Sequence, residues 1–487
     1  MSSIRQLDWQ VRRSKQDLLR SHFKGLGLSQ LKTPCLLIDK KVVEENCERM
    51  RKIVTDWGVD LRCHVKTHKT PEITRIQLQG VSDRVIVSTL AEAWGLLDPE
   101  DGLVKDGSVR DILYGVPVGA GKLEELWELR EVARSTSPCG EDFKLRLIVD
   151  HPKQVEQLDL FLNSKFSTSE IEDGFSVFVK VETGSRRAGV VPDSPNLEKL
   201  LRVILASRHV SLHGFYAHAG HSYDSRGMEE SQDFLSKELS SGLEALEVSK
   251  RVMQEDASRS SPVRKLDSDP LVLSVGSTPT AHAASQIPSD QLLERLGKEI
   301  KAKAKLELHA GNFALLDLQQ VATSSIPSSS SHPSDRGEGV LKNFPNVALS
   351  VLAEVVSEYP QRSSKGQSVE WSSSSTTTQR AQPGDEVMVD AGAIAMSKDR
   401  GPLEGFGIVV HPTEKIGWRL ERISQEHGVC SLSPDHHLKP PTPLKVGERV
   451  RILPQHACLT CAQHPAYFVI QDGGDQVVDV WVPWKGW

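Results

Sequence analysis

Apolar and polar positions follow two different periods along the chain, and these periods predict its elements. Short runs rich in β-branched residues have the spacing of strands, and the longer stretches between them have helical spacing. The strands predicted in the first two thirds of the chain are Cys35–Ile38, Leu61–Lys66, Arg84–Ser88, Asp111–Tyr114, Lys144–Val149, Val177–Glu182, Val210–His218, Leu271–Val275 and Lys305–His309. Examples of the helices predicted between them are Lys41–Trp57, Gly121–Ser135, Pro152–Asn163, Ser194–Ser207 and Glu229–Met253.

Regular alternation of strands and helices over roughly 250–280 residues predicts an α/β fold with a parallel (β/α)8 barrel. Nine strands are one too many for such a barrel. We therefore expect the first strand, Cys35–Ile38, to pair outside it.

The pattern changes after about residue 315, where strand-like runs continue without long helical stretches. These runs are Val347–Tyr359, Glu386–Ala391, Gly405–Val410, Gly428–Leu432, Glu448–Leu453 and Gln476–Val482. They predict a second, C-terminal all-β domain. The expected division is an N-terminal extension over 1–30, the barrel over 31–314 and the β-domain over 315–487. Polar stretches at 256–265, 322–338 and 362–381, the last two Ser-rich, are predicted to be surface insertions.

Composition and charge narrow the classes of function. The chain has 487 residues, of which 38% are hydrophobic and 25% charged, values ordinary for a soluble enzyme of two or three domains. A net charge of −6 gives no reason to expect a nucleic acid or a membrane as a partner. The N-terminus lacks an apolar signal core, and the seven scattered cysteines do not suggest a disulfide framework. We expect a reducing, cytoplasmic location.

Two lysines and two histidines crowd the segment Cys63–Lys69 at the end of a predicted strand. Strand alternation places Lys66 on the same face as Arg62 and His64. Neighbouring cations favour the neutral form of an amine, which is its nucleophilic form. The segment therefore predicts a Schiff base between Lys66 and pyridoxal phosphate. The alternatives are a basic strand end that binds an anion or faces solvent, and the use of Lys69, which we expect to lie past the strand.

Candidate phosphate ligands follow two other predicted strands. Gly276, Ser277 and Thr278 stand between a hydrophobic strand and a helix-prone stretch, where backbone amides and hydroxyls suit a phosphate. Many turns between a strand and a helix look similar. Gly311 and Asn312 follow the strand Lys305–His309 and are candidates for further phosphate-facing amides.

Polar side chains also gather after the strands that end at Glu182 and His218. Arg186 and Arg187 follow the first, where an arginine suits a carboxylate, although both are also compatible with solvated loop charges. Two tyrosines and two histidines gather around the second strand end, namely Tyr216, His218, His221 and Tyr223. Barrel active sites lie at the carboxyl ends of the strands, which favours a functional role for this cluster.

A metal pair is predicted at His456 and Cys458. Residues two apart in an extended chain point to the same side, so this imidazole and thiolate are able to share one ion. Two protein ligands leave open positions on zinc, as catalytic sites do. Two alternatives stay open: a buried cysteine beside a hydrogen-bonded histidine, and a structural zinc site with four ligands that adds Cys461 and His464.

Together, these motifs resemble the eukaryotic-type D-serine dehydratases. This is a branch of the fold-type III pyridoxal phosphate enzymes, which include D-threonine aldolases and, more distantly, alanine racemases. The resemblance runs from about Leu31 to the C-terminus. It rests on the motifs HVKTHK, KVETGSRRAG, GFYAHAGHSY, SVGSTPT, ELHAGNF, VDAGAIAMSKDRG, SQEHG and PQHACLT, in this order.

The resemblance implies a zinc-assisted, pyridoxal phosphate-dependent dehydration of D-serine to pyruvate and ammonia. It also implies a homodimer in which each β-domain covers the partner's barrel. Lys66 would be the catalytic lysine, and His456 and Cys458 would bind zinc. The implied cofactor-binding residues are Lys66, Arg187, Tyr216, Tyr223, Gly276, Ser277, Thr278, His309, Gly311 and Asn312. His309 stands where alanine racemases have an arginine beside the pyridine nitrogen, which is expected to alter how far the ring accepts electrons.

Three other classes of function remain open on the sequence. A D-threonine aldolase or a 3-hydroxyaspartate dehydratase would use the same lysine and metal. A non-catalytic pyridoxal phosphate carrier is disfavoured by the β-domain. A structural zinc protein would leave the HVKTHK motif unexplained.

Overall fold

The computed structural model describes residues 3–165, 174–257, 266, 270–326, 344, 346–360, 362, 380–432 and 441–487. The predicted surface insertions at 256–265, 322–338 and 362–381 lie largely outside these residues. Among the described residues, no helix combines the length and the apolar character needed to cross a membrane.

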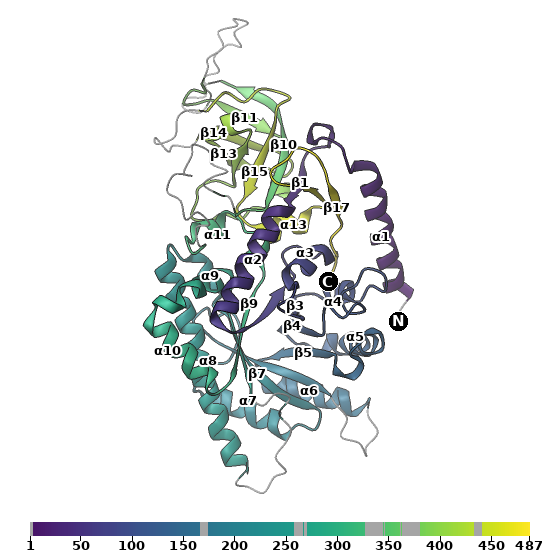
Figure 1. The fold of residues 1–487 in the computed structure, drawn as a ribbon, viewed down its shortest axis with the longest axis vertical. Coiled ribbons are helices and arrows are strands. Elements are labelled where there is room, and N and C mark those ends of the chain that lie inside the picture. Colours follow the sequence, from purple (N-terminus) through teal and green to yellow (C-terminus); the bar gives the residue numbers. More distant parts are fainter. Residues whose placement is uncertain are drawn as a thin grey trace, which may run out of the picture. The chain divides into compact units, whose positions relative to one another are not determined.

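Eight parallel strands close into a barrel in the order of the sequence (Figure 1). They are β2 (Asp60–His64), β3 (Arg84–Val87), β4 (Asp111–Pro117), β5 (Lys144–Val149), β6 (Phe175–Val181), β7 (Val210–Ala217), β8 (Val272–Val275) and β9 (Lys305–Ala310). Strand β9 pairs with β2 and completes the ring. The predicted (β/α)8 barrel is therefore confirmed.

The helices between barrel strands begin where their local sequence favours it. Thr70, Thr89 and Ser194 each accept a backbone N–H from the third residue of the helix that follows, which satisfies a donor that the helix leaves free. The helices are α3 (Pro71–Leu78), α4 (Leu90–Leu96), α5 (Leu123–Thr136), α6 (Pro152–Asn163), α7 (Pro195–Ala206), α8 (Met228–Ala257), α9 (Thr278–Ala283) and α10 (Gln291–Lys301).

The second sheet has nine strands, in the order β11-β14-β13-β12-β15-β10-β1-β16-β17. Its C-terminal strands are β10 (Leu349–Tyr359), β11 (Glu386–Val389), β12 (Gly407–His411), β13 (Trp418–Ile423), β14 (Gly428–Leu432), β15 (Arg449–Pro454), β16 (Tyr467–Ile470) and β17 (Asp479–Trp481). The short helices of this region are α11 (Leu318–Ala322), α12 (Ala393–Met396) and α13 (Ala457–Gln463). The predicted C-terminal β-domain is confirmed, with an N-terminal strand added to it.

That added strand is β1 (Cys35–Asp39), which pairs antiparallel with β10 and parallel with β16. The expectation that the first predicted strand lies outside the barrel is thus confirmed. Helix α2 (Lys40–Trp57) then leads from β1 to β2. Consequently the two compact units differ from the expected division. One consists of the residues up to Trp9, 48–311 and 484–487, and the other of 10–47 and 312–483.

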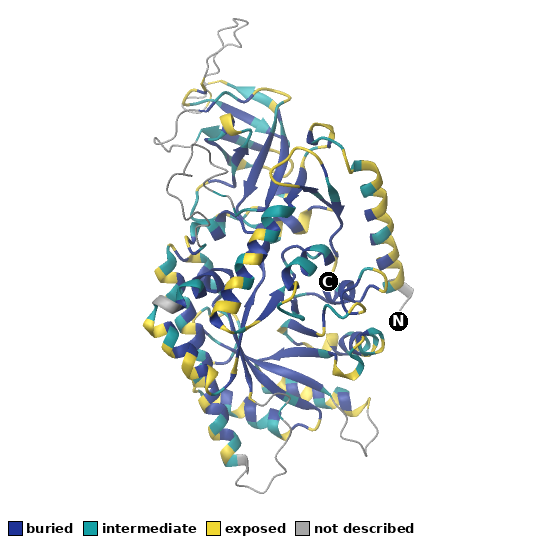
Figure 2. Ribbon diagram, viewed as in Figure 1, coloured by how far each residue is buried: buried dark blue, intermediate teal, exposed yellow. Residues whose placement is uncertain are grey.

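The N-terminal helix α1 (Ser3–Phe23) had no counterpart in the sequence prediction. Most of its surface is exposed (Figure 2). Its buried positions include Trp9, Arg12 and Gln16, of which only the tryptophan is apolar. Leu19 and Phe23 are partly buried on the same face and pack against a hydrophobic cluster, while Leu7, Val11 and Leu18 are exposed. Polar residues on the buried face and apolar residues on the exposed face obscure the period from which a helix is predicted.

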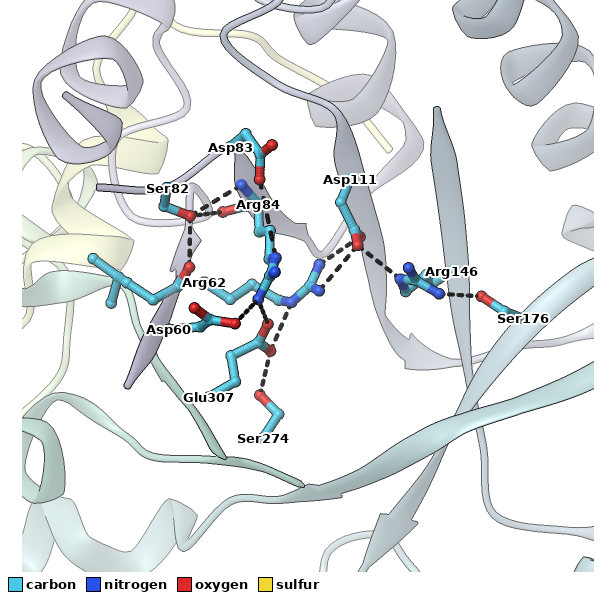
Figure 3. A network of polar contacts seen from close by, with 11 residues as sticks. Asp60, Arg62, Ser82, Asp83, Arg84, Asp111, Arg146, Ser176, Ser274 and Glu307 are labelled. Carbon is cyan, nitrogen blue, oxygen red and sulfur yellow. Dashed lines mark hydrogen bonds and ion pairs between the residues drawn. The ribbon is translucent and has the colours of Figure 1, made fainter. Parts of the chain in front are cut away.

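Charged residues fill the amino-terminal end of the barrel interior (Figure 3). Arg62 is fully buried and bonds both Asp111 and Glu307, while Arg146 bonds Asp111 and Arg84 bonds Glu307. Each of these residues is among the first three of its strand. Because every buried charge has a partner of opposite sign, the network avoids the cost of an isolated ion. The carboxyl ends of the strands are left for the site.

Candidate active site

Lys66 lies in a turn just beyond the carboxyl end of β2, which ends at His64. The predicted strand Leu61–Lys66 was thus two residues too long, and Lys66 does not extend its alternating face. The amine of Lys66 has no hydrogen bond or ion pair within the described part of the chain. Its charge contributes, after burial, to the lowered pKa of His64, and more weakly to that of His218. Lys66 therefore places a free amine among the polar groups at this end of the barrel.

Lys69 is paired with the buried carboxylate of Glu92, which also accepts the backbone N–H of Ser88 at 2.7 Å. It lies past the strand, as expected, with a φ of 53°. Burial lowers the pKa of His68 to about 4. The crowd of cations expected around Lys66 is therefore not found. The charge of Lys69 is neutralised by Glu92, and His68 is uncharged. The ion pair also disfavours Lys69 as the nucleophile.

Three neutral imidazoles stand near Lys66 or at the ends of neighbouring strands. Burial holds the pKa of His64, His218 and His309 well below the usual range. His218 donates through Nδ1 to the carbonyl of Gly276 at 2.6 Å, since a carbonyl only accepts. The ring of His309 stacks on that of Tyr216, with centroids 4.0 Å apart and an angle of 11° between the planes. The structure thus brings together predicted residues from β7, β8 and β9.

Tyr216 is buried, and burial raises the pKa of its phenol. A smaller contribution to this shift comes from Tyr223, which lies partly buried in the 3-10 turn Gly220–Asp224. The two predicted tyrosines therefore lie close enough to interact. They supply an aromatic wall and a hydroxyl group at the same end of the barrel.

The predicted phosphate residues form a tight turn after β8. Gly276 has a φ of 135°, and a Cβ atom there would lie 2.3 Å from the carbonyl oxygen of His309, so only glycine fits. Ser277 caps α9 by accepting the N–H of Thr280, and its hydroxyl bonds Ser222 at 2.7 Å. The hydroxyl of Thr278 is buried without a partner. An orphaned hydroxyl beside close-packed backbone fits a phosphate oxygen.

The two residues predicted after β9 differ in their surroundings. A Cβ atom on Gly311 would lie 2.9 Å from both Cβ and the carbonyl oxygen of His64, so this glycine permits a close approach of β9 to β2. Asn312 is the first residue of the second compact unit. Its side-chain amide donates to Asp317 at 2.7 Å, which leaves Oδ1 without a partner.

Arg187 and its neighbour Arg186 are both exposed. The guanidinium of Arg187 lies 3.1 Å from the position that a Cβ atom on Gly220 would take. Its charge adds to burial in lowering the pKa of Lys180 to about 8. Lys180 was not selected from the sequence, although a lysine within the apolar strand Phe175–Val181 was a usable signal. Its Nζ lies 4.9 Å from the centre of the Tyr216 ring.

The predicted metal residues begin α13. His456 is the N-cap, and Cys458 is the second helical residue, so the assumption that both stand in an extended chain was wrong for Cys458. At the start of this helix, Asp317 accepts the backbone N–H of Ala457 at 2.8 Å. Burial alone would lower the pKa of His456, but a hydrogen bond with Cys458 and the nearby carboxylates raise it to about 9. The imidazole and thiol are therefore in contact.

Asp399 orients this histidine by bonding its Nδ1. A carboxylate that holds one ring nitrogen is the usual arrangement for a histidine that binds zinc through the other. The alternative site with four ligands is not formed. No group of three or more His, Cys, Asp or Glu able to hold a metal occurs among the described residues. His464 instead bonds the carbonyl of Ala395 at 2.9 Å.

Two family models match the chain. One is described as a putative serine dehydratase domain and matches residues 348–470, and the other is the alanine racemase N-terminal domain and matches residues 38–260. The first therefore covers most of the second sheet, and the second covers the last two residues of β1, helix α2 and most of the barrel.

Curated relatives cover nearly the whole chain. D-serine dehydratase of Schizosaccharomyces pombe is 36% identical over 477 residues, which are 96% of this chain and 95% of that protein. D-serine dehydratase of Saccharomyces cerevisiae is 31% identical over 490 residues, which cover 96% of this chain and 99% of that protein. Among solved structures, D-threo-3-hydroxyaspartate dehydratase from Delftia sp. HT23 matches with a TM-score of 0.67 at 27% identity, covering 95% of this chain and 100% of that one. The chain accordingly belongs to the D-serine dehydratase family, within the fold-type III pyridoxal phosphate enzymes.

Proposed function

We propose that this protein is a D-serine dehydratase that forms pyruvate and ammonia with the help of pyridoxal phosphate and zinc. The observation that carries the proposal is the amine of Lys66 at the carboxyl end of a barrel strand, near the neutral imidazoles of His64 and His218. This amine has no hydrogen bond or ion pair among the residues that the structure describes. The 36% identity to a D-serine dehydratase over 96% of the chain supports the choice of substrate.

The turn after β8 and the residues around it fit the cofactor. Pyridoxal phosphate, when bound, supplies a ring that accepts negative charge from the α-carbon of an amino acid. Lys66 would carry its aldehyde, and the free hydroxyl of Thr278, with Ser277 beside it, would hold its phosphate. The stacked rings of Tyr216 and His309 would line the pocket. Gly311, Asn312, Tyr223 and Arg187 complete the proposed set.

Lys66 also has the position needed to move a proton. Once displaced by the amino group of the substrate, its amine would take the α-proton at Nζ. His64 and His218 are neutral, so they place no positive charge against the protonated amine that results.

His456 and Cys458 are the proposed zinc ligands. Zinc would act as a Lewis acid that makes a β-hydroxyl leave more readily. The contact between imidazole and thiol, and the bond that Asp399 makes with Nδ1 of His456, support this assignment. The proposal also includes a homodimer, which rests on the resemblance alone, and a cytoplasmic location, which rests on the cysteine pattern.

Incubation of the purified protein with D-serine or L-serine, with and without a zinc chelator, tests the proposal. We expect pyruvate from D-serine only. The chelator should remove this activity while the visible absorbance of the bound cofactor stays. Absence of pyruvate from D-serine would overturn the assignment, and release of glycine and an aldehyde from D-threonine would favour an aldolase. An undiminished rate after chelation would exclude zinc from the dehydration.

A further inference from the structure

The ring of His309 is held from one side by a buried carboxylate acting through a hydroxyl. Ser274 lies 2.8 Å from Oε1 of Glu307 and 3.0 Å from Nδ1 of His309. Figure 3 shows Ser274 bonded to Glu307, which bonds Arg62 in turn. Burial alone would raise the pKa of Glu307, but Arg62 and Arg84 outweigh it and lower the pKa, so this group is a carboxylate.

An ionised carboxylate can only accept hydrogen bonds. The hydroxyl hydrogen of Ser274 must therefore point at Glu307. The oxygen of Ser274 is then left to accept from His309, so Nδ1 of that ring carries the hydrogen. Since burial and the charge of Lys180 keep His309 neutral, its other nitrogen, Nε2, carries a lone pair.

The other side of the His309 ring faces His218 and the carbonyl of Gly276. The carbonyl of Gly276 requires Nδ1 of His218 to be a donor, as described above. Nε2 of His309 lies 3.4 Å from Nδ1 of His218. The carbonyl of Gly276 also lies within reach of the His309 ring, so it is shared between the two imidazoles and does not by itself select a tautomer. The carboxylate of Glu307, acting through the hydroxyl of Ser274, is what fixes the hydrogen on Nδ1 of His309.

We propose that Ser274 and Glu307 are positioning residues that hold His309 as its Nδ1–H tautomer, which makes His309 a hydrogen-bond acceptor toward the cofactor ring. This inference rests on the proposed function, in which His309 is a cofactor-binding residue. An acceptor favours a protonated ring nitrogen as its partner, while a donor such as arginine favours an unprotonated one. Ser274 and Glu307 would therefore raise the affinity of the bound ring for a proton.

The chain offers a matched control for this proposal. Ser176 belongs to the same charged network and accepts from Arg146 at 2.6 Å, but it lies on another strand and no bond between Ser176 and His309 is present. Replacement of either serine by alanine removes one hydroxyl from a buried strand position. The variants Ser274→Ala and Ser176→Ala therefore perturb packing alike and differ in their link to His309.

The test is NMR spectroscopy of the holoenzyme labelled with 15N-histidine, with His309 assigned from the signals lost in His309→Gln. We expect the Nδ1–H tautomer in the wild type and in Ser176→Ala, and its loss as the dominant form in Ser274→Ala. The visible absorbance of the bound cofactor is also followed in a pH titration. In Ser274→Ala the midpoint of this titration should fall by about one pH unit, which is a tenfold loss in the affinity of the cofactor ring for a proton. Ser176→Ala should leave that midpoint unchanged.

Three results would overturn the proposal. The first is an Nε2–H tautomer in the wild type, a measurement that needs no variant to fold. The second is a Ser274→Ala enzyme with the wild-type tautomer and titration, and the third is an equal shift in Ser176→Ala. If the predicted tautomer and titration are found but D-serine yields no pyruvate, the dehydratase assignment fails and this proposal stands.

Discussion

The buried carboxyl group of Glu238 gives a prediction with a magnitude that follows from the structure. Glu238 lies on α8, has no exposed surface, and accepts the backbone N–H of Ala219 at 2.6 Å. Burial raises its pKa to about 8, although the bonds from Ala219 and Thr280 oppose the rise. Ala219 precedes the turn that carries Tyr223, and Thr280 lies beside the proposed phosphate site. Glu238 thus supports two parts of the proposed pocket from beneath.

The sign and size of its effect on stability follow from linkage. The folded state binds this proton more tightly than the unfolded state, whose pKa is near 4.5. The stabilisation is complete below pH 4.5 and is lost as the pH rises to about 8. This shift corresponds to about 5 kcal/mol, at 1.36 kcal/mol per unit. The variant Glu238→Gln removes the titration but leaves an amide N–H without a partner, at a cost of about 1–3 kcal/mol.

We therefore expect Glu238→Gln to be less stable than the wild type at pH 5 by about 1–3 kcal/mol. At pH 9 it should be more stable by about 2–4 kcal/mol, the difference between the two effects. Thermal unfolding of the barrel, followed across this range, would show two curves that cross. The control is Glu244→Gln, at an exposed position of the same helix. If the curves for Glu238→Gln and the wild type run parallel, the carboxyl group does not titrate as argued.

Three further predictions concern the second unit and the barrel site. Asp399→Ala should weaken zinc binding by about ten- to a hundredfold, because His456 loses its orienting bond. Competition with a chromogenic chelator measures the affinity, and an unchanged affinity would show that the bond is irrelevant to the metal. Lys69→Met should lower the free energy of unfolding by about 3–5 kcal/mol, because the buried carboxylate of Glu92 loses its partner. The cofactor should stay covalently bound in this variant, and loss of the bound cofactor would point to Lys69 as the nucleophile. Gly276→Ala should reduce the affinity of the apoenzyme for pyridoxal phosphate at least tenfold in reconstitution titrations, since the added Cβ atom collides with the backbone of His309. A wild-type affinity would refute the close approach of these two backbone segments.

The sequence was sufficient for the order of the barrel strands, because parallel strands buried on both faces leave apolar runs at regular intervals. It was also sufficient to exclude the first strand from the barrel. The partners of that strand, β10 and β16, lie hundreds of residues later, so its place in the second sheet could not be predicted. Strand β13 was missed because two successive charged residues, Glu421 and Arg422, break its alternation at a bulge. Helix α1 was missed because polar Arg12 and Gln16 interrupt its buried face.

The candidate site shows the same limit at the level of single residues. Residue types and motif order indicated Lys66, His309 and the turn at Gly276, and the structure places all three at the carboxyl ends of barrel strands. Protonation states were beyond prediction, because they depend on contacts between distant segments. Glu238 has a raised pKa only because α8 packs it beneath Ala219, and nothing in its helical neighbourhood signals that burial.

The proposed function depends most on the covalent link between Lys66 and pyridoxal phosphate. Reduction of the purified enzyme with borohydride, followed by peptide mass spectrometry, would locate that link directly. We predict a single phosphopyridoxyl group, carried by Lys66 and absent from Lys66→Ala. A group found on Lys69 or Lys180 instead, or no modified lysine in enzyme saturated with the cofactor, would contradict the account.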